Sequence, residues 1–217
     1  MYSQDLLIVE RRFSRERLEP YRMAVGGNLY KAIELYEWNA AIGAAFWVTL
    51  GHVEVLVRNA MHESLAVWSK SNHADERWYL DHGGVLTSRT LTDIGKARER
   101  ARSRKRLESP GGVVSGLTLG FWRYLLTSPY ERSLWMPCLR HVWPDQALRR
   151  DVHDPLEKLH ELRNRIAHQE PIYNRNLDEL HVAALGVARW TCPETASWIE
   201  DCCDVRRMLQ FRPRLDR

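Results

Sequence analysis

The feature that most constrains this chain is a helical pattern of unusual length, which begins at Leu29 and runs to about Trp68. Apolar side chains recur along it at the three- and four-residue spacing of one helix face. The recurring positions are Ile33, Tyr36, Ala40, Trp47, Leu50, Val53, Leu56, Val57, Met61 and Leu65. The pattern predicts one long helix, or two helices that meet near Gly51. Because such a helix needs partners along its side, the pattern is typical of a helical bundle or of a hairpin that dimerises.

Helical patterns also dominate the rest of the chain, and no sustained alternation of β-branched residues predicts a strand. Residues 1–13 are expected to form an N-terminal arm, and Ser14 and Asn28 are expected to cap the helices that follow them. Further helices are predicted over Leu91–Leu107, Asp151–Ala167, Leu177–Trp190 and Glu194–Leu209, and a polar loop over residues 69–87. We therefore expect an all-α fold with a single domain over residues 14–212.

The composition is that of an ordinary globular protein, with 44% hydrophobic residues in a chain of 217. No unbroken run of about 18 apolar residues is present, so no segment is expected to span a membrane. The basic residues Arg11, Arg12 and Arg15 follow a short apolar stretch, which reverses the order found in a secretory signal. These features predict a cytoplasmic protein without a membrane partner.

The side chains that often bind metals are present but lack the spacing of a metal site. The cysteines are Cys138, Cys192, Cys202 and Cys203. Two of them are adjacent and none forms a C-x2-C pair, so we expect free thiols. One predicted helix also carries His153, Asp154, Glu157 and His160. They form no His-Glu-x-x-His motif and are expected to be solvated, so neither a metal nor a cofactor is predicted.

Positive charge is concentrated in one stretch, residues 96–106, which holds seven basic residues against the single acid Glu99, a local net charge of +6. The basic residues are Lys96, Arg98, Arg100, Arg102, Arg104, Lys105 and Arg106. Such a stretch attracts phosphate backbones, which makes it a candidate RNA-binding patch. A solvated helix end explains the same charges equally well.

The densest group of polar residues suited to chemistry lies at the end of a predicted helix, where Arg163, Asn164 and His168 precede Pro171. Asn164 and His168 are four residues apart and therefore share a helix face. A phosphate just beyond the helix end is within reach of Arg163 as well. The negative end of the helix dipole favours the imidazolium form of His168. These features suit proton transfer beside a phosphate.

Cleavage of RNA without a metal is the reaction that fits these groups, because RNA carries its own nucleophile in the 2′-hydroxyl. His168 would move the proton, Arg163 would stabilise charge on the phosphoryl oxygens, and Asn164 would orient His168 or donate to an oxygen. A single histidine covers only one of the two proton transfers. A two-fold dimer would bring a second copy into one composite site.

A purely structural role for Arg163 is the alternative that the spacing leaves open. The apolar stripe of its helix is Val152, Leu156, Leu159 and Ile166. Arg163 continues that stripe, and a guanidinium facing a core is costly unless it is paired. Glu54 is the candidate partner, because it is a carboxylate within an apolar helical stretch. Tyr173 is a candidate for base stacking, although a tyrosine at such a position more often packs.

The stretch Leu162–His168 resembles the R-x4-6-H signature of HEPN-domain ribonucleases in its Arg-Asn-x-x-x-His form. An ordered series of further landmarks resembles the Abi-like family of bacterial abortive-infection proteins (the AbiD/AbiF group). The landmarks are Arg15–Tyr21, Leu35–Asn39, His52–Asn59, Trp78–Tyr79, Leu119–Trp122 and Leu162–Pro171. The resemblance covers roughly residues 10–210, which is almost the whole chain.

The resemblance implies a HEPN-like helical bundle with extra helices and loops, dimeric, that acts as a ribonuclease toxin in phage defence. It implies that Arg163, Asn164 and His168 are the catalytic motif. Possible supporting residues are Glu54, Arg58, Asn59, His62 and Tyr173. The implied partners are RNA, a second copy of the chain, and an antitoxin or regulatory RNA. A catalytically silent module of the same family, which binds RNA or a protein, is the alternative.

Overall fold

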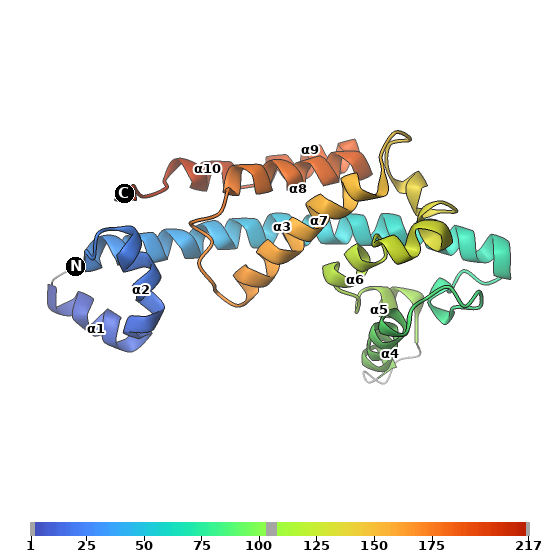
Figure 1. Cartoon of the computed structure of the whole chain (residues 1–217), viewed down its shortest axis with the longest axis horizontal. Helices are drawn as coiled ribbons and strands as arrows, with labels where there is room; N and C mark the ends of the chain where they lie inside the picture. Colours follow the sequence, from blue (N-terminus) through green and yellow to red (C-terminus); the bar gives the residue numbers. More distant parts are fainter. Residues whose placement is uncertain (1–2, 103–107, 216–217) are drawn as a thin grey trace.

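Helix α3 (Leu29–His73) is a single continuous helix of 45 residues and extends along most of the length of the molecule (Figure 1). The computed structural model describes residues 3–102 and 108–215. Of the two predicted alternatives, one long helix is confirmed, and two helices that meet near Gly51 are excluded. A glycine costs about 1 kcal/mol within a helix. The buried side chains Leu50 and Val53 on either side of Gly51 offset that cost by packing in the core.

All other elements are helical, and the described part of the chain contains no strand, so the all-α prediction is confirmed. The α-helices are α1 (Ser3–Phe13), α2 (Arg15–Ala24), α4 (Ser88–Arg102), α5 (Pro110–Val114), α6 (Leu119–Tyr124), α7 (Arg149–Ala167), α8 (Leu177–Thr191), α9 (Pro193–Asp201) and α10 (Val205–Gln210). Short 3-10 or π turns occur at η1 (Trp78–Leu80), η2 (Ser128–Tyr130), η3 (Glu131–Trp135) and η4 (Leu139–Val142).

The other helices are arranged around α3. Helices α1 and α2 cover one end, while α8, α9 and α10 run along one side (Figure 1). Helix α7 crosses α3 obliquely and contacts both α3 and α8. Helices α4, α5 and α6 gather toward the opposite end from α1. The C-terminal end of α7 is therefore placed near the middle of α3, well apart from α4.

The caps and the core explain why these elements form. The Ser14 side chain accepts from the Arg17 N–H at the start of α2, and Asn28 caps α3 in the same way, as predicted. The apolar stripe of α7 is buried in one core that includes Tyr21 near one end of the chain and Val205 near the other. The buried residues of α7 are Val152, Leu156, Leu159 and Leu162, whereas Ile166 of the predicted stripe is only partly buried.

Two predicted boundaries are wrong. The predicted helix Glu194–Leu209 is two helices, α9 and α10, because the chain turns at Cys202–Asp204 and buries Val205. The predicted loop over 69–87 begins later, because α3 continues through His73. The predicted arm is helix α1, and its last residues pack on α3 through the rings of Phe13 and Tyr36, 5.6 Å apart.

Helix α3 contains an 18-residue window of mean hydropathy 1.7, which by length and composition is enough to cross a membrane. This window is not an unbroken apolar run, so the sequence pattern alone does not predict it. The core helix of a soluble bundle meets the same test, and α3 is packed against α2, α7, α8 and α10. Within the chain, 39% of the window is buried.

Candidate active site

A Schellman motif ends helix α7 and fixes the position of the candidate catalytic residues. The Gln169 N–H donates to the Ile166 carbonyl at 2.9 Å, and the Glu170 N–H donates to the Arg165 carbonyl at 2.8 Å. Gln169 adopts the left-handed conformation that this motif requires, with φ of 54°. The helix therefore ends before the proline that the sequence suggested as its stop. His168 is the C-cap residue, in the turn where the helix dipole is negative.

Arg163 lies over an aromatic ring and not beside a carboxylate. Its guanidinium carbon is 5.2 Å from the centre of the Trp47 ring, within the range of a cation–π contact. Among the described residues it forms no ion pair. The prediction that Glu54 pairs with it is wrong, because the Glu54 Oε1 accepts the Leu119 N–H at 2.8 Å. Glu54 thus satisfies a free N–H at the start of α6.

Asn164 is held by a histidine that the sequence analysis expected to be solvated. The Asn164 Nδ2 donates to the His160 Nε2 at 3.2 Å. Burial and the nearby Arg123 guanidinium lower the pKa of His160, so its ring is neutral near pH 7 and can accept this hydrogen bond. A Cβ at Gly120 would lie 2.7 Å from the His160 Nε2, so a larger residue at this position of α6 would require the ring to shift. The side chain of Asn164 is therefore held by a ring that α6 approaches closely.

His168 is exposed and follows Asn164 on the same face of α7. Its backbone N–H donates to the Asn164 carbonyl at 3.0 Å, while its imidazole has no hydrogen-bond partner among the described residues. The ring is therefore accessible to a ligand from solvent. Arg163 and Asn164 lie in the last turns of α7 and His168 lies at its end, as predicted.

A second group of polar side chains continues the same face of α7 toward its start. Arg123 of α6 pairs with Glu157, and the His153 Nε2 lies 3.8 Å from the Glu157 Oε2. The guanidinium side chain is only 14% exposed. The expectation that His153 and Glu157 are solvated is wrong, because α6 packs on this face. The sequence signal was the four-residue spacing of His153 and Glu157, which marks a shared face but does not show what covers it.

The supporting residues predicted on α3 do not contact the end of α7. The Arg58 Nε donates to the Asn59 Oδ1 at 3.1 Å, and Asn59 is exposed. The His62 Nδ1 accepts from the Trp78 Nε1 at 3.0 Å, and burial lowers the pKa of His62. Each residue of a helix advances it by about 1.5 Å, so a residue only seven positions beyond Trp47 is already about 10 Å farther along α3.

Tyr173 is a packing residue, not an exposed stacking platform. Its ring is 7% exposed and lies 5.2 Å from that of Tyr21. Its hydroxyl donates to the Pro20 carbonyl at 2.8 Å, and burial raises the pKa of Tyr173. The buried Asn39 Oδ1 accepts the backbone N–H groups of Ile172 and Tyr173, at 2.7 and 3.0 Å. This segment therefore anchors the turn that follows His168 onto α2 and α3.

The predicted basic patch is partly neutralised where the structure describes it. Glu108 accepts from the Arg98 Nε at 3.0 Å and from the Arg102 Nε at 2.8 Å. Burial opposes the effect, but these two guanidinium groups lower the pKa of Glu108. Lys96 lies 3.9 Å from Asp93. Of the remaining basic residues, Arg100 belongs to α4, and Arg104, Lys105 and Arg106 lie outside the described residues.

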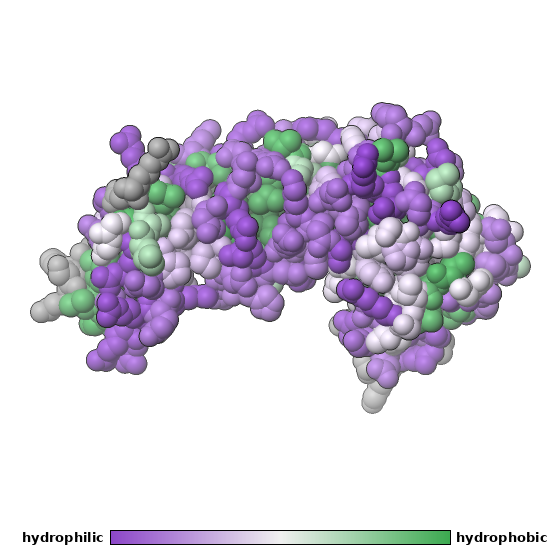
Figure 2. Space-filling model, in the orientation of Figure 1, coloured by the Kyte–Doolittle hydropathy of each residue, from purple (hydrophilic) through white to green (hydrophobic). Residues whose placement is uncertain are grey.

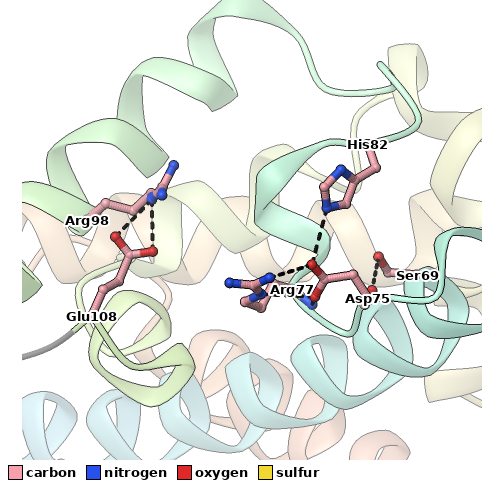
Figure 3. Close-up of polar contacts among 6 residues, drawn as sticks. All are labelled: Ser69, Asp75, Arg77, His82, Arg98 and Glu108. Atoms are coloured by element: carbon pink, nitrogen blue, oxygen red, sulfur yellow. Dashed lines mark hydrogen bonds and ion pairs between the residues drawn. The ribbon is translucent and has the colours of Figure 1, made fainter.

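Figure 3 places the pair of Arg98 and Glu108 near a second charged cluster. There the Arg77 Nη2 donates to the Asp75 Oδ2 at 2.7 Å, and the His82 Nε2 is 3.2 Å from the same oxygen. Hydrogen bonds from Arg77, and then from His82, hold the pKa of Asp75 well below its usual range. The cluster holds the segment that follows α3. In Figure 1, α4 lies well apart from the C-terminal end of α7.

The end of α7 thus presents an accessible imidazole, an oriented amide and a guanidinium without a carboxylate partner in the described part of the chain. Together they can bind an anion and transfer a proton beside it. No cluster of three or more His, Cys, Asp or Glu side chains that could hold a metal ion occurs among the described residues. Comparisons with protein-family models, curated proteins and solved structures find no match to this chain.

Proposed function

We propose that the protein is a metal-independent endoribonuclease whose active site is the C-terminal end of α7. The observation that supports this most is the state of Arg163, which contacts the Trp47 ring and pairs with no carboxylate among the described residues. A structural arginine at this position would meet an acid, as Arg123 meets Glu157 and Arg165 meets Glu170. The charge of Arg163 is therefore available for a phosphate.

In the proposed reaction the RNA 2′-hydroxyl attacks the adjacent phosphorus, and the bond to the 5′-oxygen breaks. His168 accepts the proton of the attacking hydroxyl or protonates the leaving oxygen. Arg163 stabilises the charge that develops on the phosphoryl oxygens. Asn164, oriented by His160, donates to one of these oxygens or holds the imidazole. The products carry a 2′,3′-cyclic phosphate and a free 5′-hydroxyl.

The second proton transfer requires a second group, and we propose that a two-fold partner supplies it. Six exposed small or apolar residues form a stripe at helical spacing along α3, and Trp47 of this stripe contacts Arg163. The residues are Ala40, Ala44, Trp47, Val48, Gly51 and Val55. Trp47 and Val48 are 46% and 51% exposed. Figure 2 shows that the face turned to the viewer is largely hydrophilic and carries several small, separate apolar patches. A second copy on this stripe would bring two α7 ends together.

The cellular role that we propose follows from the Abi-like resemblance and not from the geometry. The protein would act in the cytoplasm as a toxin in phage defence by abortive infection. An antitoxin or regulatory RNA would restrain it. A catalytically silent module that binds RNA or a protein remains the competing function. The pairing of Arg98 and Arg102 with Glu108 weakens the case for RNA binding through α4.

The two functions are separated by incubating purified protein with end-labelled RNA in EDTA. The ribonuclease predicts fragments with 2′,3′-cyclic phosphate ends. It also predicts that analytical ultracentrifugation detects a dimer, and that Trp47→Glu shifts it to monomer and lowers cleavage. The silent module predicts salt-sensitive binding without fragments.

A further inference from the structure

Cys203 occupies a built site far along the chain from Arg163, in the turn between α9 and α10. Its Sγ lies 3.1 Å from the Thr49 Oγ1 of α3 and 3.4 Å from the His181 Nε2 of α8. Thr49 and His181 are 1% and 6% exposed, while Cys203 itself is only partly buried. Two buried polar groups from two helices therefore converge on the sulfur of one partly buried cysteine.

The hydrogen bonds at this sulfur can be completed in both protonation states. In the thiol form, the Cys203 S–H donates to the Thr49 oxygen, and the Thr49 hydroxyl donates to the Ala45 carbonyl at 3.1 Å. In the thiolate form, the Thr49 hydroxyl rotates to donate to the sulfur. The His181 N–H and the Val205 backbone N–H donate to it as well. Three donors then stabilise the anion.

Burial opposes ionisation of Cys203, but the hydrogen bonds from His181 and Thr49 outweigh it and lower the pKa of the thiol. The nearest acid in sequence, Asp204, is paired with Arg207 at 3.0 Å. The surroundings of Cys203 differ from those of Cys138, which is buried and whose pKa burial raises to about 12. All four cysteines are free, so they can be compared within one molecule.

We propose that Cys203, with His181 and Thr49, is a nucleophilic thiol and a site of covalent modification by hydroperoxides and soft electrophiles. With hydrogen peroxide the thiolate attacks one oxygen, so that an S–O bond forms and the O–O bond breaks. The sulfur is oxidised by two electrons to a sulfenic acid, and the peroxide is reduced. The departing hydroxide takes up a proton from solvent and leaves as water.

Modification at this sulfur would loosen the turn between α9 and α10. An added oxygen or alkyl group displaces the Thr49 hydroxyl or the His181 ring, which tie the turn before α10 to α3 and α8. Helix α10 is further attached by the Trp38 Nε1, which donates to the Met208 carbonyl at 2.9 Å. A modified protein is therefore expected to retain its helices, and its amide hydrogens are expected to exchange faster in the turn at Cys202–Asp204.

The proposal is tested by alkylating the native full-length protein with iodoacetamide at pH 6 and pH 8 and quantifying each cysteine peptide by mass spectrometry. The ratio of the two rates at one cysteine cancels differences in accessibility. An ordinary thiol loses reactivity on the order of 100-fold over this range, because its thiolate fraction falls. Between pH 8 and pH 6, the alkylation rate of Cys203 is expected to fall by a factor at least about threefold smaller than the factor for Cys202 in the same sample. Equal losses at the two cysteines would overturn the proposal.

Two pairs of variants test whether the contacts of Thr49 and His181 cause the altered reactivity of Cys203. Thr49→Val removes the hydroxyl at nearly constant volume and is expected to raise the pH 8 to pH 6 rate ratio of Cys203, whereas Thr49→Ser keeps the original ratio. His181→Asn is expected to bring the Cys203 ratio to that of Cys202, and Cys202→Ser leaves the Cys203 ratio unchanged. Circular dichroism checks that each variant is folded. A folded Thr49→Val protein with the original ratio contradicts the assigned role of the hydroxyl.

Discussion

The guanidinium carbon of Arg163 lies 5.2 Å from the centre of the Trp47 ring, and among the described residues no carboxylate pairs with this arginine. A half-exposed cation–π contact holds the side chain in place without neutralising its charge. Arg165, two residues later on the same helix, differs in this respect. It is paired with Glu170 and donates to the Pro171 carbonyl. The contrast separates an arginine available for a ligand from one that maintains the fold.

Replacing Arg163 with alanine should therefore cost little stability. An exposed cation–π contact contributes about 0.5–1 kcal/mol, so the free energy of unfolding in urea should fall by no more than about 1 kcal/mol. Cleavage of RNA should fall about 100-fold or more, because a charge-stabilising group is lost. Arg165→Ala is the matched control. We expect it to lower the free energy of unfolding, while the protein that remains folded still cleaves RNA. An Arg163→Ala protein that is folded and fully active contradicts the assigned role.

Asn39 is expected to be essential for stability. Its Oδ1 accepts two backbone N–H groups, those of Ile172 and Tyr173, and its side chain is buried. Asn39→Ala leaves both donors unsatisfied and should lower the unfolding free energy by about 2–4 kcal/mol. The exposed Asn59→Ala serves as control and should change it by less than about 0.5 kcal/mol. Similar effects of the two substitutions in urea denaturation would show that the Asn39 contacts are not formed.

Glu54 should stabilise α6 and not the active site. It accepts the Leu119 N–H at the start of that helix. Glu54→Ala should lower the unfolding free energy by about 0.5–2 kcal/mol, the usual effect of losing a side-chain cap, whereas Glu54→Gln keeps an acceptor and should lower it less. Cleavage per folded molecule should be unchanged in both variants. If Glu54→Gln lost cleavage without losing stability, the carboxylate would instead have a catalytic role.

Two half-buried histidines should make the protein less stable in mild acid. Burial lowers the pKa of His62 and of His160, so below about pH 6.5 the unfolded chain binds protons that the folded chain does not. The free energy of unfolding should therefore fall as the pH drops from about 6.5 toward the folded pKa values. His62→Gln and His160→Gln retain a hydrogen-bond acceptor and should make this decline shallower. An unchanged pH profile in the double variant contradicts the prediction.

Much of the fold could be predicted from local sequence patterns. The periodicity from Leu29 predicted α3, and the polar residues Ser14 and Asn28 correctly marked the starts of α2 and α3. These features depend on neighbours within a few residues. The turn that separates α9 from α10 could not be predicted in this way. It depends on Cys203, whose contacts come from Thr49 and His181, far away in the sequence.

The candidate site was predictable as a stretch but not in its contacts. The spacing of Arg163, Asn164 and His168 correctly placed the first two in the last turns of one helix and the third at its end, where His168 is the C-cap residue. Their neighbours come from α3 and α6, whose positions depend on the tertiary fold. For this reason Glu54 was assigned to Arg163 in error, and the contact of His160 with Asn164 was missed.

The most direct test of the central claim is cleavage of end-labelled RNA by the purified protein in EDTA. The wild-type protein and an Arg163→Ala, a His168→Ala and a His141→Ala variant should be compared at equal folded concentration. The last is a control, since His141 is exposed and lines a cavity against Ala60–Asn72 of α3. We predict 2′,3′-cyclic phosphate ends from the wild-type protein and from His141→Ala, and loss of cleavage in the other two variants. Undiminished cleavage by a folded His168→Ala protein, or no cleavage by the wild-type protein, would contradict the account.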